Sequence, residues 1–191
     1  MGAVLGRSEV LQRAVPSDLK KQRCMKTLRL ILGDQLNASH PWFEGVSDEV
    51  VYLLAEMRQE TDYAPHHIQK VMAFFAAMRA FAEERRADGH RVVYLSLDEG
   101  RNTQGLEANV RMVMAEEGCE RFEYQLPDEW RLDAQLKAFA AEFGDRAEAA
   151  DTHHFLTRRG DLAEQFKGKK TYLMESFYRR MRKAHWMLDR K

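Results

Sequence analysis

Residues 28–38 read LRLILGDQLNA, an apolar run that ends abruptly at Gly33, Asp34 and Gln35. A short, continuous apolar run followed by turn residues is typical of a strand that is buried on both faces of a parallel sheet. An acid and an amide then stand at the tip of the first strand. Their position raises the question of what these two side chains hold.

Four further segments have the character of buried strands. The first strand is predicted over residues 27–33, and the others over residues 49–56, 90–97, 121–126 and, more weakly, 146–151. Helices are predicted between them over residues 65–87, 106–117 and 132–143, from apolar residues at three- and four-residue spacing and a glycine after each helix. Strands and helices that alternate with short links predict an α/β fold with a five-stranded, parallel, doubly wound sheet.

The two ends of the chain differ from this alternating body. Residues 1–24 show no periodicity and contain a Pro16-Ser17 break, so we expect a poorly ordered extension, with Met25 as an alternative start. The α/β domain is expected over residues 25–155. Residues 156–191 are expected to form a basic helical linker, and from about residue 170 the segment TYLMESFYRRMRKAHWMLDRK predicts one long amphipathic helix with an aromatic face.

The charge of the chain sums to zero but is unevenly distributed. Residues 155–191 carry a net charge of +7 and residues 1–24 a net charge of +3, which leaves −10 for the middle. A basic tail on an acidic body indicates an anionic partner or an intramolecular contact.

The compartment is expected to be the cytoplasm. No run of apolar residues approaches the length of a membrane span, so no membrane contact is predicted, and the N-terminus lacks the pattern of a signal peptide. Cys24 and Cys119 are far apart and belong to no CxxC motif. They are interpreted as inert thiols, and two cysteines are too few for an iron–sulfur cluster.

Polar side chains follow the predicted strands at their carboxyl ends, where open α/β sheets bind ligands. The candidates after the first strand are Gly33, Asp34, Gln35 and Leu36. Those after the second are Glu56, Arg58, Glu60, Tyr63, His66 and His67. Asp98 follows the third strand, and Asp128, Glu129 and Trp130 follow the fourth.

The sequence has no motif for cradling phosphate. No GxGxxG follows the first strand, and GKKT at 168–171 lacks the glycine of a P-loop, because Ala163 stands at that position. The expected ligand therefore carries little or no phosphate and presents hydroxyl groups and a flat heterocycle, which carboxylates, an amide and an aromatic face can bind.

Each candidate also has a structural interpretation. Asp34 and Gln35 could cap a turn, and Glu129 with Trp130 could anchor a loop. The adjacent pairs His66-His67 and His153-His154 lack the spacing of metal ligands, so no metal site and no catalytic residue are predicted. Two alternatives stay open: a domain without a ligand, and a small-molecule enzyme that uses Asp34 or Glu129 as a base.

The segments RLILGDQL, YLLAEMRQETDYAPHHIQKVMAFFAAMRAFAEERRADGHRVVYLSLDE, LPDEWR and YLMESFYRRMRK together resemble one family. It is the deoxyribodipyrimidine photolyase-related family, the iron–sulfur bacterial (6-4) photolyases and cryptochromes, over residues 25–183. The resemblance implies a flavodoxin-like or Rossmann-like N-terminal domain that binds the antenna chromophore 6,7-dimethyl-8-ribityllumazine. It also implies a separate C-terminal domain that holds FAD and a [4Fe–4S] cluster and repairs DNA.

The resemblance assigns a cofactor-binding role to residues of the carboxyl edge. Expected to contact the chromophore are Gly33, Asp34, Gln35, Leu36, Glu60, His67, Asp128, Glu129 and Trp130. Asp128 departs from the glycine of the family pattern, and Ala55 stands where some members have cysteine.

The resemblance also implies what this chain does not do by itself. Without FAD and the cluster, this polypeptide alone is not expected to repair DNA, and DNA contact is expected only in a full-length context. The expected partners are a C-terminal photolyase domain, a separate partner chain, or a second copy bound through the final helix.

Overall fold

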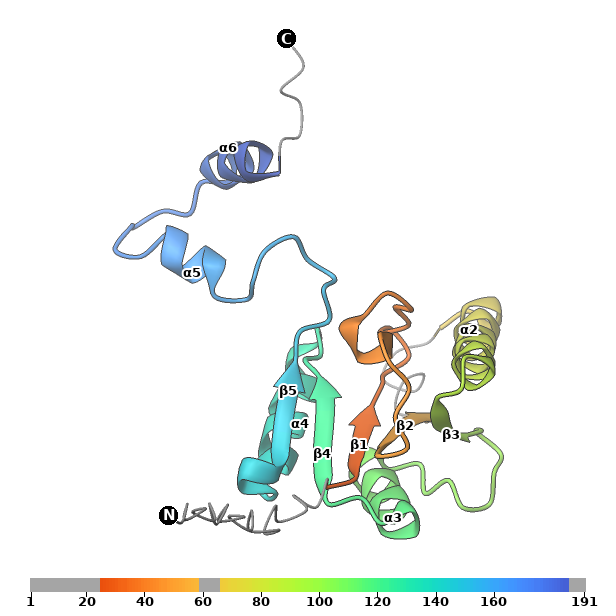
Figure 1. Cartoon of the computed structure of the whole chain (residues 1–191). Coiled ribbons are helices and arrows are strands. Elements are labelled where there is room, and N and C mark those ends of the chain that lie inside the picture. Colours follow the sequence, from red (N-terminus) through yellow and green to blue (C-terminus); the bar gives the residue numbers. More distant parts are fainter. Residues whose placement is uncertain (1–24, 59–65, 186–191) are drawn as a thin grey trace, which may run out of the picture.

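The structure is a computed structural model, and it describes residues 25–58 and 66–185. One sheet forms the centre, and its strands are β1 (Thr27–Leu30), β2 (Val50–Ala55), β3 (Arg91–Leu95), β4 (Arg121–Gln125) and β5 (Ala147–Ala150). All pairings are parallel, in the order β3-β2-β1-β4-β5 (Figure 1). The predicted five-stranded parallel α/β fold is confirmed. The expected extension over residues 1–24 lies outside the described residues.

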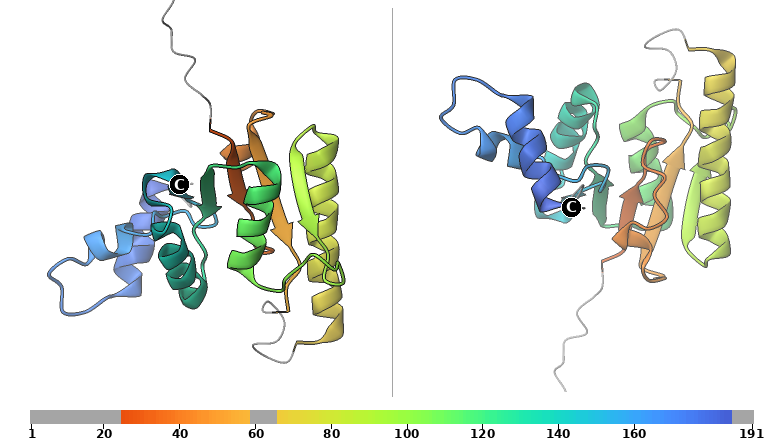
Figure 2. Two further views of the ribbon diagram at one scale, coloured as in Figure 1. Left: turned by 90° about the horizontal axis from the view of Figure 1, so that it is seen from below. Right: turned by 90° about the horizontal axis from the view of Figure 1, so that it is seen from above.

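Helices cover both faces of the sheet, as a doubly wound fold requires (Figure 2). The helices α3 (Leu106–Glu117) and α4 (Trp130–Ala141) pack on one face, in a core with Leu28, Leu53 and Phe122. The helix α2 (Ile68–Ala87) and the short 3-10 helix η1 (Pro41–Phe43) pack on the other face, around Ile31, Tyr52 and Leu54. A second short 3-10 helix, η2 (Gly144–Arg146), precedes β5.

The strands are shorter than predicted, and the first shows why. β1 ends at Leu30, although Ile31 and Leu32 remain buried. The backbone N–H of Gln35 donates to the carbonyl of Leu32, which turns the chain out of the sheet at this point. The apolar run therefore marks burial correctly and overstates the length of the strand.

Two helix starts differ from the predicted ones. α4 begins at Trp130, two residues before the predicted start, because the carboxylate of Glu129 accepts from the backbone N–H groups of Arg131 and Leu132. This is an N-cap, which supplies partners for donors that the first helical turn leaves free. α2 begins at Ile68 and has His67 as its N-cap residue, so Pro65, predicted as its start, precedes the helix and lies outside the described residues.

Gly33 is required by the close approach of α2. A methyl group at this position would lie 2.3 Å from Cζ of Phe74 and 2.8 Å from Sδ of Met78. Both contacts are shorter than any that real side chains make, so α2 or these two side chains would have to shift. Glycine at position 33 lets the strand tip lie against α2 without displacing the side chains of Phe74 and Met78.

We expect Gly33→Ala to lower the free energy of unfolding by about 1–3 kcal/mol, as overpacking does in other cores. Urea denaturation followed by circular dichroism measures the change. Gly100→Ala is the matched control, because a methyl group there meets no atom within 4 Å, and it should leave stability within about 0.5 kcal/mol. Equal stability of the two variants would contradict the tight contact at Gly33.

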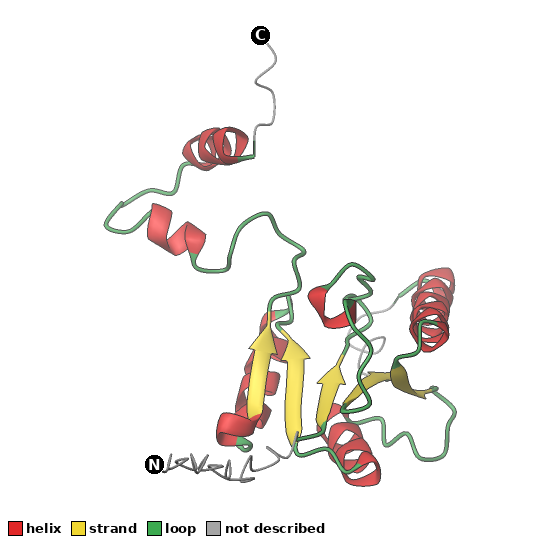
Figure 3. Cartoon of the chain, in the orientation of Figure 1, coloured by secondary structure: helices red, strands yellow, loops and turns green. Residues whose placement is uncertain are grey.

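The C-terminal extension, residues 155–185, leaves the sheet after β5 and contains α5 (Asp161–Gln165) and α6 (Met174–Ala184). In Figures 1 and 3 it runs away from the edge at which the strand arrows end. The predicted helix from about residue 170 begins four residues later, because Gly168 has a φ of 74° and the chain turns there, after the buried Phe166. Among the described helices, none is long and apolar enough to cross a bilayer.

Candidate functional site

The carboxyl ends of β1 and β4 form the switch point of the sheet. From β1 the chain proceeds outward through β2 to β3, and it then returns to the other side of β1 as β4. The connections after β1 and β4 therefore diverge to opposite faces and leave a crevice, which is where open α/β sheets bind ligands. We use the name crevice for this place between residues 31–36, which follow β1, and residues 126–130, which follow β4, and we call these two segments its walls.

Gln35 ties the two walls together. Its side chain is only 1% exposed. Its Oε1 accepts from the backbone N–H of Leu32 at 3.0 Å, and its Nε2 donates to the carbonyl of Gln125, at the end of β4, at 3.2 Å. Both ends of the amide are therefore used within the protein. The amide after the first strand joins the tips of two neighbouring strands.

Gln125 is the opposite case. It is also 1% exposed, yet within the described residues neither Nε2 nor Oε1 of its side chain has a hydrogen-bond partner. A buried, unpaired amide costs roughly 1–3 kcal/mol, and such groups in native proteins commonly have a functional cause. An unpaired donor and an unpaired acceptor therefore lie side by side at the switch point.

The charges of Asp34 and Asp128 influence each other at the switch point. Burial raises the pKa of Asp34, and the nearby charge of Asp128 adds to this effect, against the opposite influences of its own backbone N–H and of His154. Asp34 nevertheless reaches solvent. Asp128 is bound by two side chains of the segment that follows β5, since Nδ1 of His154 lies 2.7 Å and Nη2 of Arg159 lies 3.1 Å from its carboxylate. The structure thus brings these two predicted site residues together.

Three other predicted site residues lie in the segments beside the crevice, and they differ from one another in burial and in contacts. Leu36 is half-buried and packs against the core on the α2 face. Glu129 caps α4, and its contact with Arg131 holds the pKa of its carboxyl group below the usual range. The side chain of Trp130 is 79% exposed, so its indole is free to contact a ligand or another surface.

Glu56, at the end of β2, is a structural anchor. It is fully buried, and its carboxylate accepts from Nε and Nη2 of Arg79 at 2.6 and 2.9 Å, from the hydroxyl of Tyr94, and from the backbone N–H of Leu97. Burial alone would raise the pKa of Glu56, but these hydrogen bonds outweigh it and lower the pKa below its usual value. The residue connects β2, β3 and α2 and has no acceptor left for a ligand.

We expect Glu56→Gln to lower the free energy of unfolding by about 2–3 kcal/mol at pH 7, because charge-assisted hydrogen bonds are lost. A carboxyl group with a lowered folded pKa contributes stability above its unfolded pKa of about 4.3, and the contribution is lost as pH falls through the folded value. The gap between the wild type and the variant should therefore narrow below about pH 4, as measured by urea denaturation at several pH values. A gap that is independent of pH would contradict this role.

The comparisons with known proteins agree with the resemblance seen in the sequence. Residues 29–190 match the family described as deoxyribodipyrimidine photo-lyase-related protein. This chain belongs to that family. A (6-4) photolyase from Agrobacterium fabrum (strain C58) is 34% identical over 165 residues, which cover 86% of this chain and 32% of the relative. The chain thus spans about a third of the length of that photolyase.

Two further predicted site residues of this photolyase-related chain do not join this group in the structure. His67 caps α2, where its Nδ1 accepts from the backbone N–H of Gln69 at 3.2 Å. Glu60 lies outside the described residues. Across residues 25–58 and 66–185, no group of three or more His, Cys, Asp or Glu side chains is arranged to hold a metal ion.

His40 is a contributor to the site that the sequence analysis missed. It is 3% exposed; its Nδ1 accepts from the backbone N–H of Trp42, and its Nε2 therefore donates to the carbonyl of Asp151 at 2.8 Å. Burial lowers the pKa of His40, which favours this neutral form. It joins the loop after β1 to the end of β5, 111 residues away. Gln125 was also missed, although a glutamine at the end of an apolar strand is itself a signal.

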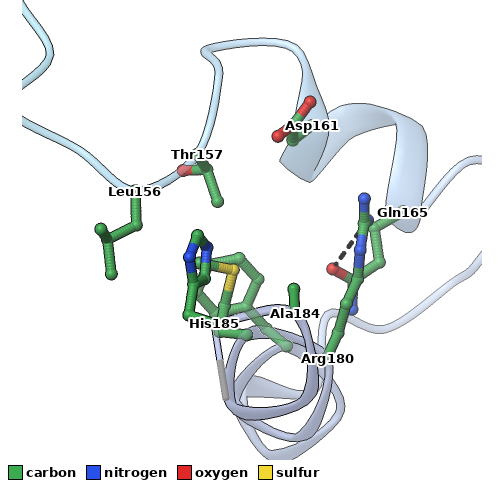
Figure 4. Close-up of a pocket in the computed structure, with 9 residues that line it drawn as sticks. Leu156, Thr157, Asp161, Gln165, Arg180, Ala184 and His185 are labelled. Carbon is green, nitrogen blue, oxygen red and sulfur yellow. Dashed lines mark hydrogen bonds between the residues drawn. The ribbon is translucent and has the colours of Figure 1, made fainter. Parts of the chain in front are cut away.

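A small cavity in the extension differs in kind from the crevice. It lies between α6 and the segment that leads into α5, with Leu156, Phe177 and Met181 in its wall, and Arg180 donates to Oε1 of Gln165 beside it (Figure 4). Its volume of about 70 Å³ is well below the roughly 300–1,000 Å³ of ligand pockets. The cavity is a packing gap between two helical segments.

Proposed function

We propose that this chain is an antenna-chromophore domain that binds 6,7-dimethyl-8-ribityllumazine in the crevice between the ends of β1 and β4. The observation that carries the proposal is the buried, unpaired carboxamide of Gln125 at the switch point. A lumazine ring has an imide edge, in which an N–H donor stands beside carbonyl acceptors. A carboxamide can pair with such an edge through two hydrogen bonds, one in each direction.

The remaining chemistry of the crevice suits this ligand. The chain has no glycine-rich phosphate loop, and the pigment has no phosphate. Asp34 can accept hydrogen bonds from the hydroxyl groups of the ribityl chain, and the exposed indole of Trp130 can stack on a flat ring. Contacts from Glu60, His67 and Glu129 to the ligand stay predictions, and the contacts observed at His67 and Glu129 are those of helix caps.

The role proposed for these residues is orientation. The pigment, when bound, absorbs near-ultraviolet to violet light, and the protein holds the ring at a fixed position and angle. Gln35 and the parallel strands supply the rigidity, because they fix both walls of the crevice. Transfer of the excitation to FAD, a [4Fe–4S] cluster and light-dependent repair of DNA are proposed only for an assembly that includes the remaining region of a photolyase.

We expect Gln125→Leu to weaken lumazine binding at least about tenfold, because two hydrogen bonds are lost, and to raise the free energy of unfolding by about 1 kcal/mol, because an unpaired amide is removed. The measurements are fluorescence titration with the lumazine and urea denaturation. Gln35→Leu is the matched control. It removes an equally buried but fully paired amide, so it should lower the free energy of unfolding by about 1–3 kcal/mol.

The two variants separate ligand binding from stability. A Gln125→Leu protein that loses stability as Gln35→Leu does would show that the amide is paired within the fold, and the proposal would lose its support. A wild-type chain that does not bind the lumazine would contradict the proposal. Two alternative functions from the sequence analysis would then remain. They are a domain that binds no ligand, and a small-molecule enzyme that uses Asp34 or Glu129 as a base.

We also propose that the C-terminal extension binds the remaining region of a photolyase. Its apolar side chains are largely exposed, namely Phe155, Leu156, Leu162, Tyr172, Leu173, Met174 and Tyr178. An apolar surface of this kind commonly marks an interface. The relative from Agrobacterium fabrum is about three times longer than the matched region, so a protein of this family has further chain that can cover this surface.

We expect this chain to bind a protein made of the unmatched two thirds of the Agrobacterium fabrum photolyase. The double variant Met174→Ser/Tyr178→Ser should weaken the complex about tenfold or more, because exposed apolar anchors are removed, while Arg182→Ser should change it little. Analytical ultracentrifugation measures both. Self-association of the chain that the same double variant abolishes, without binding to the photolyase region, would show that a second copy is the partner instead. The cytoplasmic location expected from the sequence stays a prediction.

A further inference from the structure

The chain that leaves β5 is fastened to the loop before α4 by a polar bridge. We name it the Asp128 bridge, and it consists of Asp128, His154 and Arg159. Nδ1 of His154 lies 2.7 Å from Oδ2 of Asp128, and Nη2 of Arg159 lies 3.1 Å from Oδ1. One carboxylate therefore binds two side chains that lie five residues apart, on the path from the sheet to α5.

Arg159 binds more than the carboxylate. The same Nη2 group donates to the carbonyl of Leu126 at 2.9 Å and to the carbonyl of Pro127. These two carbonyls and Asp128 are consecutive residues of the loop that forms one wall of the crevice. The guanidinium thus holds the backbone of that wall as well as its carboxylate.

The apolar side chains next to the bridge contribute little to holding the extension on the sheet domain. Phe155 and Leu156 lie between its two basic members, and their side chains are 63% and 62% exposed. The backbone there has no regular secondary structure until α5 begins at Asp161. The bridge therefore restrains the start of the extension at the carboxyl edge, next to the contacts of His40 with Asp151 and His153.

The bridge also adjoins the proposed ligand site. Asp128 belongs to the segment that follows β4 and Asp34 to the segment that follows the neighbouring β1, and the charges of Asp128 and His154 both act on Asp34. A ligand that contacts Asp34 or displaces the loop at Asp128 changes the surroundings of the bridge.

We propose that the Asp128 bridge is a clamp that fixes the direction of the C-terminal extension relative to the sheet and couples that direction to the crevice. The clamping itself does not depend on the ligand, whereas the coupling rests on the proposed function. Because energy transfer between pigments depends on their relative position and angle, a clamp at this place would set the geometry between this domain and whatever the extension binds. His154 and Arg159 act as positioning residues.

The clamp is tested by the distance between the sheet domain and α6. Spin labels are placed at Ala76→Cys on α2 and Lys183→Cys on α6, both exposed, in a Cys24→Ser background; Cys119 is buried and is left in place. Pulsed electron paramagnetic resonance gives the distribution of distances between the labels. With the native bridge we expect one narrow distribution.

Arg159→Gln should broaden this distribution by about 10 Å, the scale expected for a free tether of about six residues. Asp128→Asn should broaden it by less, because Arg159 still donates to the carbonyls of Leu126 and Pro127. Glu148→Gln, which removes an exposed carboxylate from β5, is the matched control and should leave the width unchanged. Urea denaturation of each variant separates loss of the clamp from loss of the fold. A distribution that stays narrow in folded Asp128→Asn and Arg159→Gln would overturn the proposal.

Addition of the lumazine to the labelled proteins tests the coupling. With the native bridge, bound lumazine should shift or narrow the distribution, and in Asp128→Asn it should do neither, although fluorescence shows that it binds. Lumazine that binds the native protein without changing the distribution would overturn the coupling and leave the clamp. If the lumazine does not bind at all, both the proposed function and the coupling are wrong. The widths of the distance distributions measured without ligand still test whether the bridge acts as a clamp.

Discussion

The switch point depends on one side chain, the amide of Gln35. A parallel sheet needs no side chain to join adjacent strands within the ladder, but beyond the last backbone pairs the two connections diverge to opposite faces. Gln35 extends the pairing at this place, since it accepts from the end of the first strand segment and donates to the last residue of β4. The segments that follow β1 and β4 are therefore tied to each other at the switch point.

Gln35 and Gln125 show how two buried glutamines at the same place can differ in their hydrogen bonding. Both are buried to the same degree, and they are adjacent across β1 and β4. The paired amide contributes to folding, whereas the unpaired one costs free energy. In the proposed function, the complementary edge of a phosphate-free heterocycle would supply the missing partners of Gln125.

The sheet could be predicted from the sequence because its signals are local. The apolar runs, the glycines after the helices and the strand–helix alternation each need only a few neighbouring residues. The roles of single polar residues could not be predicted, because their partners are distant: Gln35 contacts a carbonyl 90 residues away, and His40 one 111 residues away. Glu56 looked like a site residue and is an anchor, since Arg79 and Tyr94 reach it only in the folded chain. Asp128 is expected from the sequence to contact a ligand, and the partners that the structure shows for it, His154 and Arg159, lie 26 and 31 residues further along the chain.

The most direct test of this account follows the two buried side-chain amides by nuclear magnetic resonance. In ligand-free protein, the N–H groups of Gln35 should be protected from exchange with solvent more strongly than those of Gln125. Addition of the lumazine should shift the resonances of the Gln125 side chain and protect them, and it should leave those of Gln35 nearly unchanged. If the Gln125 resonances stay as they were while the lumazine binds, the ligand lies elsewhere and the central claim is wrong.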